Sequence, residues 1–416
     1  MDLAKQIKAS STQALISMQR IYGCQHYPRY EKAIFIKGDG VWLWDKDGKK
    51  YFDGNATYST NAGGHRNEEL IATLHSLLEE QCIPLTANVL MGPTHALLVR
   101  ELALLTGLDK ALIMNTGAEA VETSLKIARR WAEKAKGVPK DSVEIISFLN
   151  CFHGRTIAAT ATSSDPHYRD GFGAFPPGFI HSVPYDDIAA LKRAITPNTG
   201  AILIEPIQCE GGMIIPTKRY FTQVRELCTE RKILMIADEI QTGLGRTGKL
   251  FCCEWFGVKP DLILLGKALG QIIPVSAVVG IKEAMNILEP GQHGSTFGGT
   301  SISCGVALAS LAQITQNEMA WVKNAETMGQ YFRRELRKLQ KKSPYIKTIR
   351  GRGLAIGIEI NTNRISTKVL IEQLLEEGVV SGNAHNIALR VTPALNVCKE
   401  AIDWALPRFE KVLCPR

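Results

Sequence analysis

Two apolar segments of the sequence end in residues that could carry out covalent and acid–base chemistry. KILMIADE (232–239) ends in Asp238 and Glu239, and DLILLGK (261–267) ends in Lys267. A lysine at the end of a buried strand is costly unless it is paired, solvated or chemically used. Alone it is more often a surface residue, but an acid at a neighbouring strand end changes that balance. Pyridoxal phosphate needs such a pair, a Schiff-base lysine and a carboxylate opposite its pyridine nitrogen.

A tetrad earlier in the chain could hold the phosphate of such a cofactor. Asn115-Thr116-Gly117-Ala118 follows the apolar run ALIMN and opens a helical pattern. Thr116 can cap that helix, and the free N–H groups of its first turn suit a phosphate. By itself the tetrad is typical of an ordinary helix N-cap, so it supports a cofactor site only together with the lysine and the acid.

A glycine-rich segment offers a different interpretation. Gly243–Gly248 fits G-x-G-x-x-G, and with Lys249 it nearly fits a P-loop, but Leu250 stands where a P-loop has Ser or Thr. The segment does not directly follow a strand, and about ten residues remain before the next turn, too few for a crossover helix. A nucleotide-binding enzyme therefore stays a weaker alternative.

The elements that must position these residues follow from hydrophobic periodicity. Short, branched apolar runs predict strands buried on both faces, and amphipathic stretches such as the one after Gly117 predict helices between them. This alternation predicts an α/β fold with a mostly parallel sheet, helices on both faces, and catalytic groups at the carboxyl ends of the strands. The predicted strands are 111–115, 143–148, 201–206, 232–239, 261–267 and 276–281.

The two ends of the chain have a different pattern of elements. At the N-terminus, Asp-Gly pairs form the turns of a small strand meander. Toward the C-terminus, a long helix (303–342) is followed by a smaller α/β lobe with a helix at 367–377, two short strands and a last helix near 399–413. We therefore expect an N-terminal segment (1–55) that is part of a small domain, a large cofactor-binding domain (56–300), and a long helix with the C-terminal small domain (301–416).

Composition excludes several classes of protein. The 416 residues are 45% hydrophobic and 22% charged, with a mild net charge of +8 spread along the chain, so neither disorder nor nucleic-acid binding is expected. No apolar run is long enough to cross a membrane, and the N-terminus lacks the apolar stretch of a signal peptide. Ten cysteines without a C-x-x-C pair predict reduced thiols in the cytoplasm, with neither disulfides nor a metal site.

Six motifs, taken together and in this order, resemble the class III pyridoxal-phosphate aminotransferases, and within them most resemble the ornithine δ-aminotransferases. The motifs are NTGAEA (115–120), FHGRT (152–156), EPIQCEGG (205–212), ADEIQTGLGRTGK (237–249), LLGKAL (264–269) and HGSTFGG (293–299). The resemblance covers about residues 30–410. It implies the aspartate-aminotransferase fold, known as fold type I, and a homodimer with active sites at the subunit interface.

The resemblance also implies a role for each cofactor residue. Lys267 would form the Schiff base and move the proton, and Asp238 would pair with the pyridinium. The other implied contacts are Gln241 with the ring hydroxyl, Phe152 stacked on the ring, His153 beside it, Thr116, Gly117 and Ala118 at the phosphate, and Ser295 and Thr296 in HGSTFGG, with Thr296 reaching the phosphate from the partner subunit.

The substrate residues implied by the resemblance describe transfer of the δ-amino group of ornithine to 2-oxoglutarate. Tyr58 and Arg155 would hold the α-carboxylate of ornithine, whereas Arg390 would hold that of glutamate and Glu210 would face Arg390. Departures from the family pattern, among them Asn88 in place of a pocket tyrosine, leave the amino donor open. Acetylornithine, lysine, 4-aminobutyrate or a pathway-specific amine are alternative donors, and a catalytically silent homologue is a further alternative.

Overall fold

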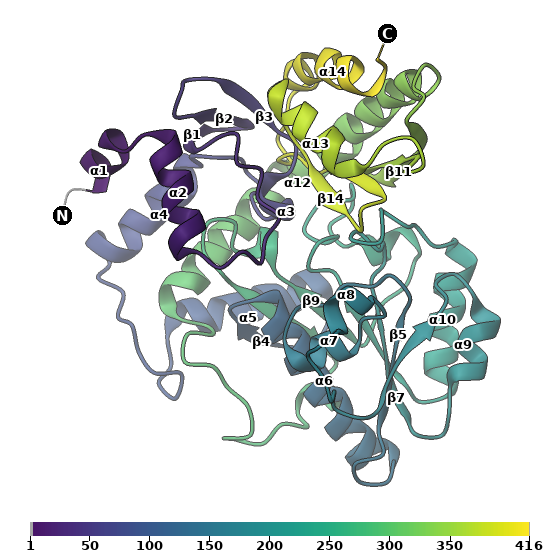
Figure 1. Cartoon of the computed structure of the whole chain (residues 1–416). Coiled ribbons are helices and arrows are strands. Elements are labelled where there is room, and N and C mark those ends of the chain that lie inside the picture. The colour runs from purple at the N-terminus through teal and green to yellow at the C-terminus, as the bar shows by residue number, and fades with distance from the viewer. Residues whose placement is uncertain (1–2, 416) are drawn as a thin grey trace.

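The computed structural model describes residues 3–415, and its centre is a seven-stranded sheet (Figure 1). All six strands predicted from the apolar runs are present; the sequence analysis missed only the edge strand β6. The strand order is β4 (Lys110–Met114), β10 (Ser276–Gly280), β9 (Leu262–Leu265), β8 (Leu234–Asp238), β7 (Thr199–Ile204), β5 (Glu144–Phe148) and β6 (Phe179–Val183).

The sheet is mostly parallel, as predicted, with one exception. Strands β9, β8, β7, β5 and β6 run parallel, whereas β10 is antiparallel to both of its neighbours. The connection from β9 to β10 contains only the short turn η4 (Lys267–Leu269). Parallel strands need a crossover of a dozen or more residues, so this short connection makes β10 run back along β9.

Helices cover both faces of the large sheet. In β7, Ala201 and Leu203 face the layer that contains α6 (Gly117–Trp131), and Ile202 and Ile204 face the layer that contains α10 (Lys218–Glu230). This period-two alternation between two apolar layers explains why the strands read as continuous apolar runs. The other helices of this region are α5 (Pro93–Thr106), η2 (Ala132–Lys136), α7 (Ile157–Ala161), α8 (Pro166–Arg169), α9 (Ile188–Ala194), η3 (Cys252–Trp255) and α11 (Lys282–Met285).

The two ends of the chain meet in a pair of four-stranded sheets beside the large one (Figure 1). Strand β13 pairs in parallel with β3, Val379 opposite Phe52, and Phe52 packs edge to face on Phe332 at 6.4 Å. The first sheet is β1 (Phe35–Asp39), β2 (Trp42–Asp45), β3 (Lys50–Asp53) and β13 (Val379–Val380); the second is β11 (Ile346–Arg352), β12 (Ala355–Ile360), β15 (Ala388–Val391) and β14 (Gly382–Ala384). The domain boundaries at residues 55 and 300 stay a prediction.

The long helix α12 (Ser301–Gln340) is interrupted, which corrects the expectation of one continuous helix. Gln316–Met319 have non-helical dihedral angles. The two halves pack on different partners, because Gly305 approaches Leu77 and Gly329 approaches Gly353. The remaining helices are α1 (Leu3–Ala9), α2 (Thr12–Tyr22), α3 (Ala56–Ser59), α4 (Glu68–His75), η1 (Ser76–Glu80), α13 (Thr367–Glu376) and α14 (Lys399–Leu413).

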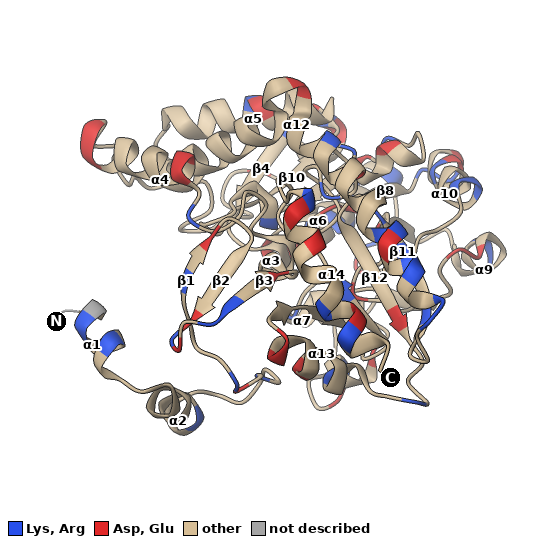
Figure 2. Ribbon diagram, turned by 90° about the horizontal axis from the view of Figure 1, so that it is seen from above, with Lys and Arg blue, Asp and Glu red and all other residues tan. Residues whose placement is uncertain are grey.

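Charged residues of both signs are interspersed over the elements (Figure 2). Within residues 3–415, no helix combines the length and apolar character needed to cross a membrane. The same residues contain no cluster of three or more His, Cys, Asp or Glu side chains that could hold a metal ion.

Candidate active site

A cavity of about 220 Å³ opens at the carboxyl ends of β7, β8 and β9. It brings Lys267 and Asp238 together, which the sequence predicted from their positions at neighbouring strand ends. Seven of the predicted cofactor residues line it: Gly117, Ala118, Phe152, His153, Asp238, Gln241 and Lys267; Gly154, Glu205, Ile240 and Thr242 complete the wall.

Lys267 is held in an unfavourable backbone conformation at the base of this cavity. Its φ is +45°, in the left-handed region that non-glycine residues rarely adopt. Its amine has no hydrogen bond or ion pair within residues 3–415, and burial lowers its pKa. Strained residues persist where the surrounding structure over-determines them, commonly at functional sites. Lys267 is therefore an amine that is not engaged as a structural ion-pair partner and is available to a ligand of the cavity.

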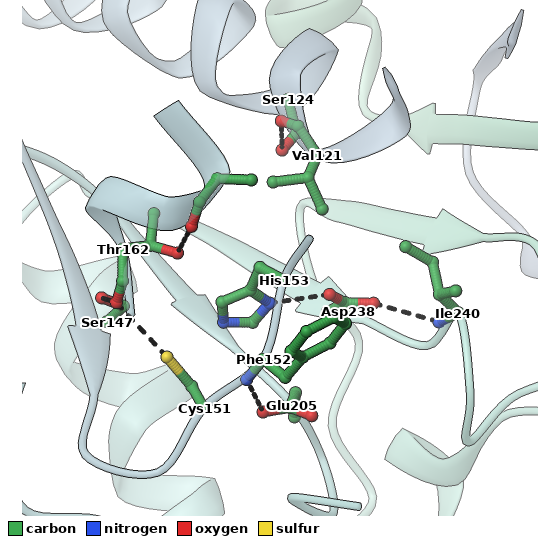
Figure 3. Close-up of polar contacts among 11 residues, drawn as sticks. Val121, Ser124, Ser147, Cys151, Phe152, His153, Thr162, Glu205, Asp238 and Ile240 are labelled. Atoms are coloured by element: carbon green, nitrogen blue, oxygen red, sulfur yellow. Dashed lines mark hydrogen bonds and ion pairs between the residues drawn. The ribbon is translucent and has the colours of Figure 1, made fainter. Parts of the chain in front are cut away.

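Asp238 and His153 form a buried pair (Figure 3). The Asp238 Oδ2 atom lies 2.7 Å from His153 Nδ1, and its Oδ1 accepts the backbone N–H of Ile240 at 3.1 Å. Burial lowers the pKa of His153, but the Cys151 sulfur and the hydrogen bond to Asp238 outweigh burial and hold it well above its ordinary value. The other ring nitrogen, Nε2, is buried without a partner in the described chain. These contacts fix the direction of the Asp238 carboxylate.

The N-terminus of α6 forms the opposite side of the cavity. Thr116 and Glu119 make a capping box: Thr116 Oγ1 accepts the Glu119 N–H at 3.2 Å, and Glu119 Oε2 accepts the Thr116 N–H at 2.7 Å. A Cβ atom at Gly117 would lie 3.2 Å from Ile240, so glycine suits this close approach. The N–H groups of Gly117 and Ala118, in the first helical turn, have no intrahelical acceptor and suit an anion.

The loop with Ser295 and Thr296 lies outside the cavity of its own chain. Asn115 Nδ2 donates to Ser295 Oγ at 2.9 Å. Asn88 Nδ2 donates to the carbonyls of Ser295 at 2.7 Å and Gly298 at 2.8 Å. Asn88, which departs from the family pattern, is thus a clamp on this loop, a role that its sequence position did not reveal.

Arg155 and Gln241 lie around the mouth of the cavity. The Arg155 guanidinium lies 5.4 Å from the centre of the Phe152 ring and 3.6 Å from that of Tyr168. Gln241 Nε2 lies 3.4 Å from the backbone carbonyl of Tyr58. Tyr58 belongs to α3, where four consecutive residues from Ala56 to Ser59 have positive φ, a left-handed turn that no local pattern predicted.

Arg390 and Glu210 form an ion pair, as the resemblance implied. Arg390 lies in β15 with a fully buried side chain, whereas the Glu210 side chain is 18% exposed. The guanidinium also lies 5.0 Å from the centre of the Tyr58 ring, and its Nε and Nη2 atoms are buried without partners within residues 3–415. A guanidinium with unused donors can accept a carboxylate ligand in place of Glu210.

Glu205 is a cavity residue to which the sequence analysis assigned no role. It directly follows β7 and is 7% exposed. The signal that identified Asp238, an acid at the end of an apolar strand, was present in AILIEP as well. The resemblance directed attention to Glu210 in the same motif instead.

The glycine-rich segment after β8 is not a nucleotide-binding loop. Residues 241–247 form turns, and no helix of the α6 type follows them. Arg246 is buried and donates to the carbonyl of Pro393. A Cβ atom at Gly353 would lie 2.4 Å from the backbone of Thr247. The segment is packed against the C-terminal region, so it has no room for a phosphate.

The donor set of the cavity fits pyridoxal phosphate. It offers an unpaired amine, a carboxylate held by two hydrogen bonds, an aromatic wall from Phe152, and free N–H groups at a helix N-terminus. A larger hollow, of about 500 Å³, lies near the start of β8, and its carboxylate, Asp261, is already paired with Arg225 at 2.8 Å. Of the two, only the smaller cavity provides the pair of groups that this cofactor requires.

Comparisons with known proteins agree with this chemistry. The family described as Aminotransferase class-III matches residues 26–413. An ornithine aminotransferase from Geobacillus sp. (strain WCH70) is 43% identical over 406 residues, covering 97% of this chain and 99% of the relative.

The chain is also similar to solved structures of aminotransferases. Ornithine aminotransferase from Toxoplasma gondii ME49 has a TM-score of 0.94 and 37% identity, covering 99% of this chain and 96% of that one; a further structure of the Toxoplasma gondii enzyme has pyridoxal phosphate at partial occupancy in its active site. Acetylornithine aminotransferase from Elizabethkingia anophelis has a TM-score of 0.85 and 34% identity, covering 97% and 99%. The chain therefore belongs to the class III aminotransferases, and it is a transaminase of fold type I that uses pyridoxal phosphate.

Proposed function

We propose that this transaminase transfers the δ-amino group of ornithine to 2-oxoglutarate, which gives glutamate 5-semialdehyde and glutamate. The observation that carries the proposal is the ion pair between Glu210 and Arg390. Ornithine must present its δ-amine, so its α-carboxylate must bind far from Lys267. Glutamate must present its α-amine, so its α-carboxylate must bind near Lys267. One site can serve both substrates if its nearer carboxylate anchor is masked in one half-reaction and free in the other.

The cofactor residues then have the following roles. When bound, pyridoxal phosphate supplies an electron sink for the carbanion that forms as the substrate loses a proton beside its amine. Lys267 Nζ takes that proton and returns it at the neighbouring position. The Asp238 carboxylate, oriented by His153, would oppose the pyridine nitrogen, and Gln241 would contact the ring hydroxyl. Phe152, which lines the cavity, would lie against the ring and exclude water from one face.

Two segments would hold the phosphate. Thr116, Gly117 and Ala118 provide the helix N-terminus of α6. Thr296 of the partner subunit would complete the cradle, and Ser295 positions that loop through its hydrogen bond with Asn115. This arrangement places Thr296 at the other subunit's cavity, in keeping with its absence from the lining of its own.

The substrate anchors alternate between the half-reactions. Tyr58 and Arg155 hold the α-carboxylate of ornithine while Glu210 masks Arg390. When 2-oxoglutarate or glutamate enters, its α-carboxylate displaces Glu210 from Arg390, and Arg155 takes the distal carboxylate. The exchange is feasible because one charge-assisted pair replaces another of similar strength.

A homodimer with interfacial active sites belongs to this proposal. The segment before α5 exposes Leu85 (64%), Val89 (89%), Leu90 (60%) and Met91 (97%), and the nearby loop exposes Phe297 (62%). Apolar side chains gathered in this way mark an interaction surface. A second copy of the chain that covers it would also bring its own Thr296 loop to the site.

We also propose that the enzyme works in the cytoplasm. All ten cysteines are free thiols, and six of them are buried. Unpaired cysteines in this number are typical of a reducing compartment.

A donor screen with 2-oxoglutarate tests the proposed function. Ornithine, N-acetylornithine, lysine and 4-aminobutyrate are compared at equal concentrations, with glutamate formation as the readout and product analysis to locate the amine that was lost. We expect kcat/KM for ornithine to exceed that for each other donor at least about tenfold, or roughly 1.4 kcal/mol. A preference for N-acetylornithine or another amine would reject ornithine as donor. Absence of turnover with every donor would indicate a silent homologue.

A further inference from the structure

Glu205 is a buried carboxyl group of the cavity. Its side chain lines the cavity with Lys267 and Asp238, yet none of the ion pairs within residues 3–415 includes it. Among the described residues its side chain makes a single hydrogen bond, in which Oε2 accepts the backbone N–H of Phe152 at 3.2 Å (Figure 3). A buried carboxylate that forms no ion pair is costly, so this placement favours the uncharged acid.

The surroundings of Glu205 strengthen that preference. Burial is the main cause that raises the pKa of Glu205, and the carboxylates of Asp238 and Glu210 act in the same direction. His153 and the Phe152 N–H oppose them, and the result is a pKa of about 8. Near neutral pH the side chain is therefore mainly a carboxylic acid, and above about pH 8 it becomes a carboxylate.

The hydrogen bond to Phe152 connects Glu205 to two other residues of the cavity wall. Phe152 directly precedes His153, the partner of Asp238, and its ring forms a wall of the cavity. The Tyr185 hydroxyl in turn donates a hydrogen bond to the Glu205 backbone carbonyl at 2.5 Å, which holds the backbone that carries the Glu205 side chain. Glu205 thus ties the end of β7 to the segment that carries both Phe152 and His153.

We propose that Glu205 is a positioning residue with two effects. Its side chain anchors the Phe152 backbone, and by remaining uncharged it admits a substrate with two carboxylates to a cavity that the Asp238 carboxylate already lines. This inference rests on the proposed function in one respect, because it takes 2-oxoglutarate as the amino acceptor. Ionised Glu205 would add a negative charge that has no ion-pair partner beside the incoming dianion. The effect should appear in KM for 2-oxoglutarate rather than in kcat.

Glu205→Gln and Glu205→Ala separate the two parts of the proposal. Glutamine is neutral at every pH, and its side-chain carbonyl can still accept the Phe152 N–H. Alanine is neutral but cannot accept that hydrogen bond. Glu226→Gln, at an exposed position in α10, is the matched control. Thermal unfolding of each variant shows that it is folded before it is assayed.

The first measurement is KM for 2-oxoglutarate between pH 7 and pH 9. With a group of pKa about 8, about one molecule in ten keeps the neutral acid at pH 9, so KM should rise about tenfold in the wild type and in Glu226→Gln. In Glu205→Gln the rise should be less than about twofold. The other groups that face Glu205 are His153, Asp238, Glu210, Cys209, Tyr185 and Lys267. They are present in all three proteins, so their titration cancels in the comparison.

The second measurement is the dissociation constant of pyridoxal phosphate at pH 7, followed by cofactor absorbance and circular dichroism. We expect Glu205→Ala to weaken binding at least about fivefold, from the loss of one buried hydrogen bond, and Glu205→Gln to bind within about twofold of the wild type. Equal cofactor affinity in Glu205→Ala and the wild type would overturn the anchoring role. The same KM rise in Glu205→Gln as in the wild type would overturn the charge role.

Failure of the proposed function gives a different pattern. If the wild type prefers another amino donor, KM for 2-oxoglutarate is measured with that donor and the inference is tested unchanged. If 2-oxoglutarate is not an acceptor, the charge role is overturned together with the proposed function. The cofactor dissociation constants then still decide whether Glu205 anchors Phe152.

Discussion

Arg390, fully buried in β15, donates a hydrogen bond to the carboxylate of Glu210, which follows β7. Arg390 belongs to the second four-stranded sheet, whereas Glu210 lies in a turn beyond β7, so the pair joins the C-terminal region to the segment that follows the central sheet. Unused donors on the guanidinium make Glu210 a replaceable partner rather than a permanent one. This relationship underlies the first prediction.

Glu210→Ala should free Arg390 at all times. The half-reaction with glutamate should then become faster, because no carboxylate must be displaced, and ornithine should lose δ-regiospecificity, because Arg390 captures its α-carboxylate. Single-turnover rates with each substrate, together with product analysis, measure both effects. Glu226→Ala, a change at an exposed glutamate, is the control. An unchanged ratio of the two rates would show that Glu210 is not a gate and would favour another amine donor.

Lys267→Ala should abolish turnover and the visible absorbance of lysine-linked cofactor. The reason is that Lys267 is the one amine that lines the described cavity, so no other residue can form the covalent link. Lys341→Ala, at an exposed position beyond α12, should behave as the wild type. Near-normal turnover in Lys267→Ala would reject the assignment of the active site, and circular dichroism would exclude misfolding as the cause of a loss.

Asp238→Ala should lower kcat/KM by well over tenfold. Without the carboxylate the pyridine nitrogen loses its proton, and the ring becomes a poor electron sink. Steady-state kinetics with saturating cofactor measure the loss. His153→Phe removes the group that orients Asp238 and should cause a smaller loss. A decrease below about tenfold for Asp238→Ala, roughly 1.4 kcal/mol, would show that Asp238 is not the partner of the ring nitrogen.

Asn88→Ala should loosen the loop of Ser295 and Thr296. Asn88 donates two hydrogen bonds to the backbone of that loop, and each contributes about 1 kcal/mol. Because the loop serves the partner's phosphate cradle in the proposed homodimer, affinity for pyridoxal phosphate should fall. Equilibrium cofactor titration and size-exclusion chromatography measure affinity and oligomeric state. Asn363→Ala, at an exposed position, should change neither; equal cofactor affinity in both variants would contradict the clamp.

The sequence by itself determined the central sheet and predicted residues that the structure brings to one cavity. Apolar runs located six of its seven strands, because strands buried on both faces leave a continuous hydrophobic record. Placing Lys267 and Asp238 at the carboxyl ends of such strands was enough to bring them to one edge of a parallel sheet. The N-cap at Thr116 could also be predicted, because helix capping depends only on residues that are close in the sequence. Motif resemblance supplied Arg390 and Glu210, which the local pattern did not distinguish from surface charges.

Tertiary structure alone decided the features that depend on contacts between distant segments. The pairing of β3 with β13, the interruption of α12, the Asn88 clamp and the left-handed turn that carries Tyr58 leave no periodic signal. Glu205 shows the physical reason most clearly. Whether a glutamate after a strand is a surface charge or a neutral buried acid depends on its burial and on whether it forms an ion pair. Both are set by the packing of β7 against the Phe152–His153 segment, and a sequence does not record that packing.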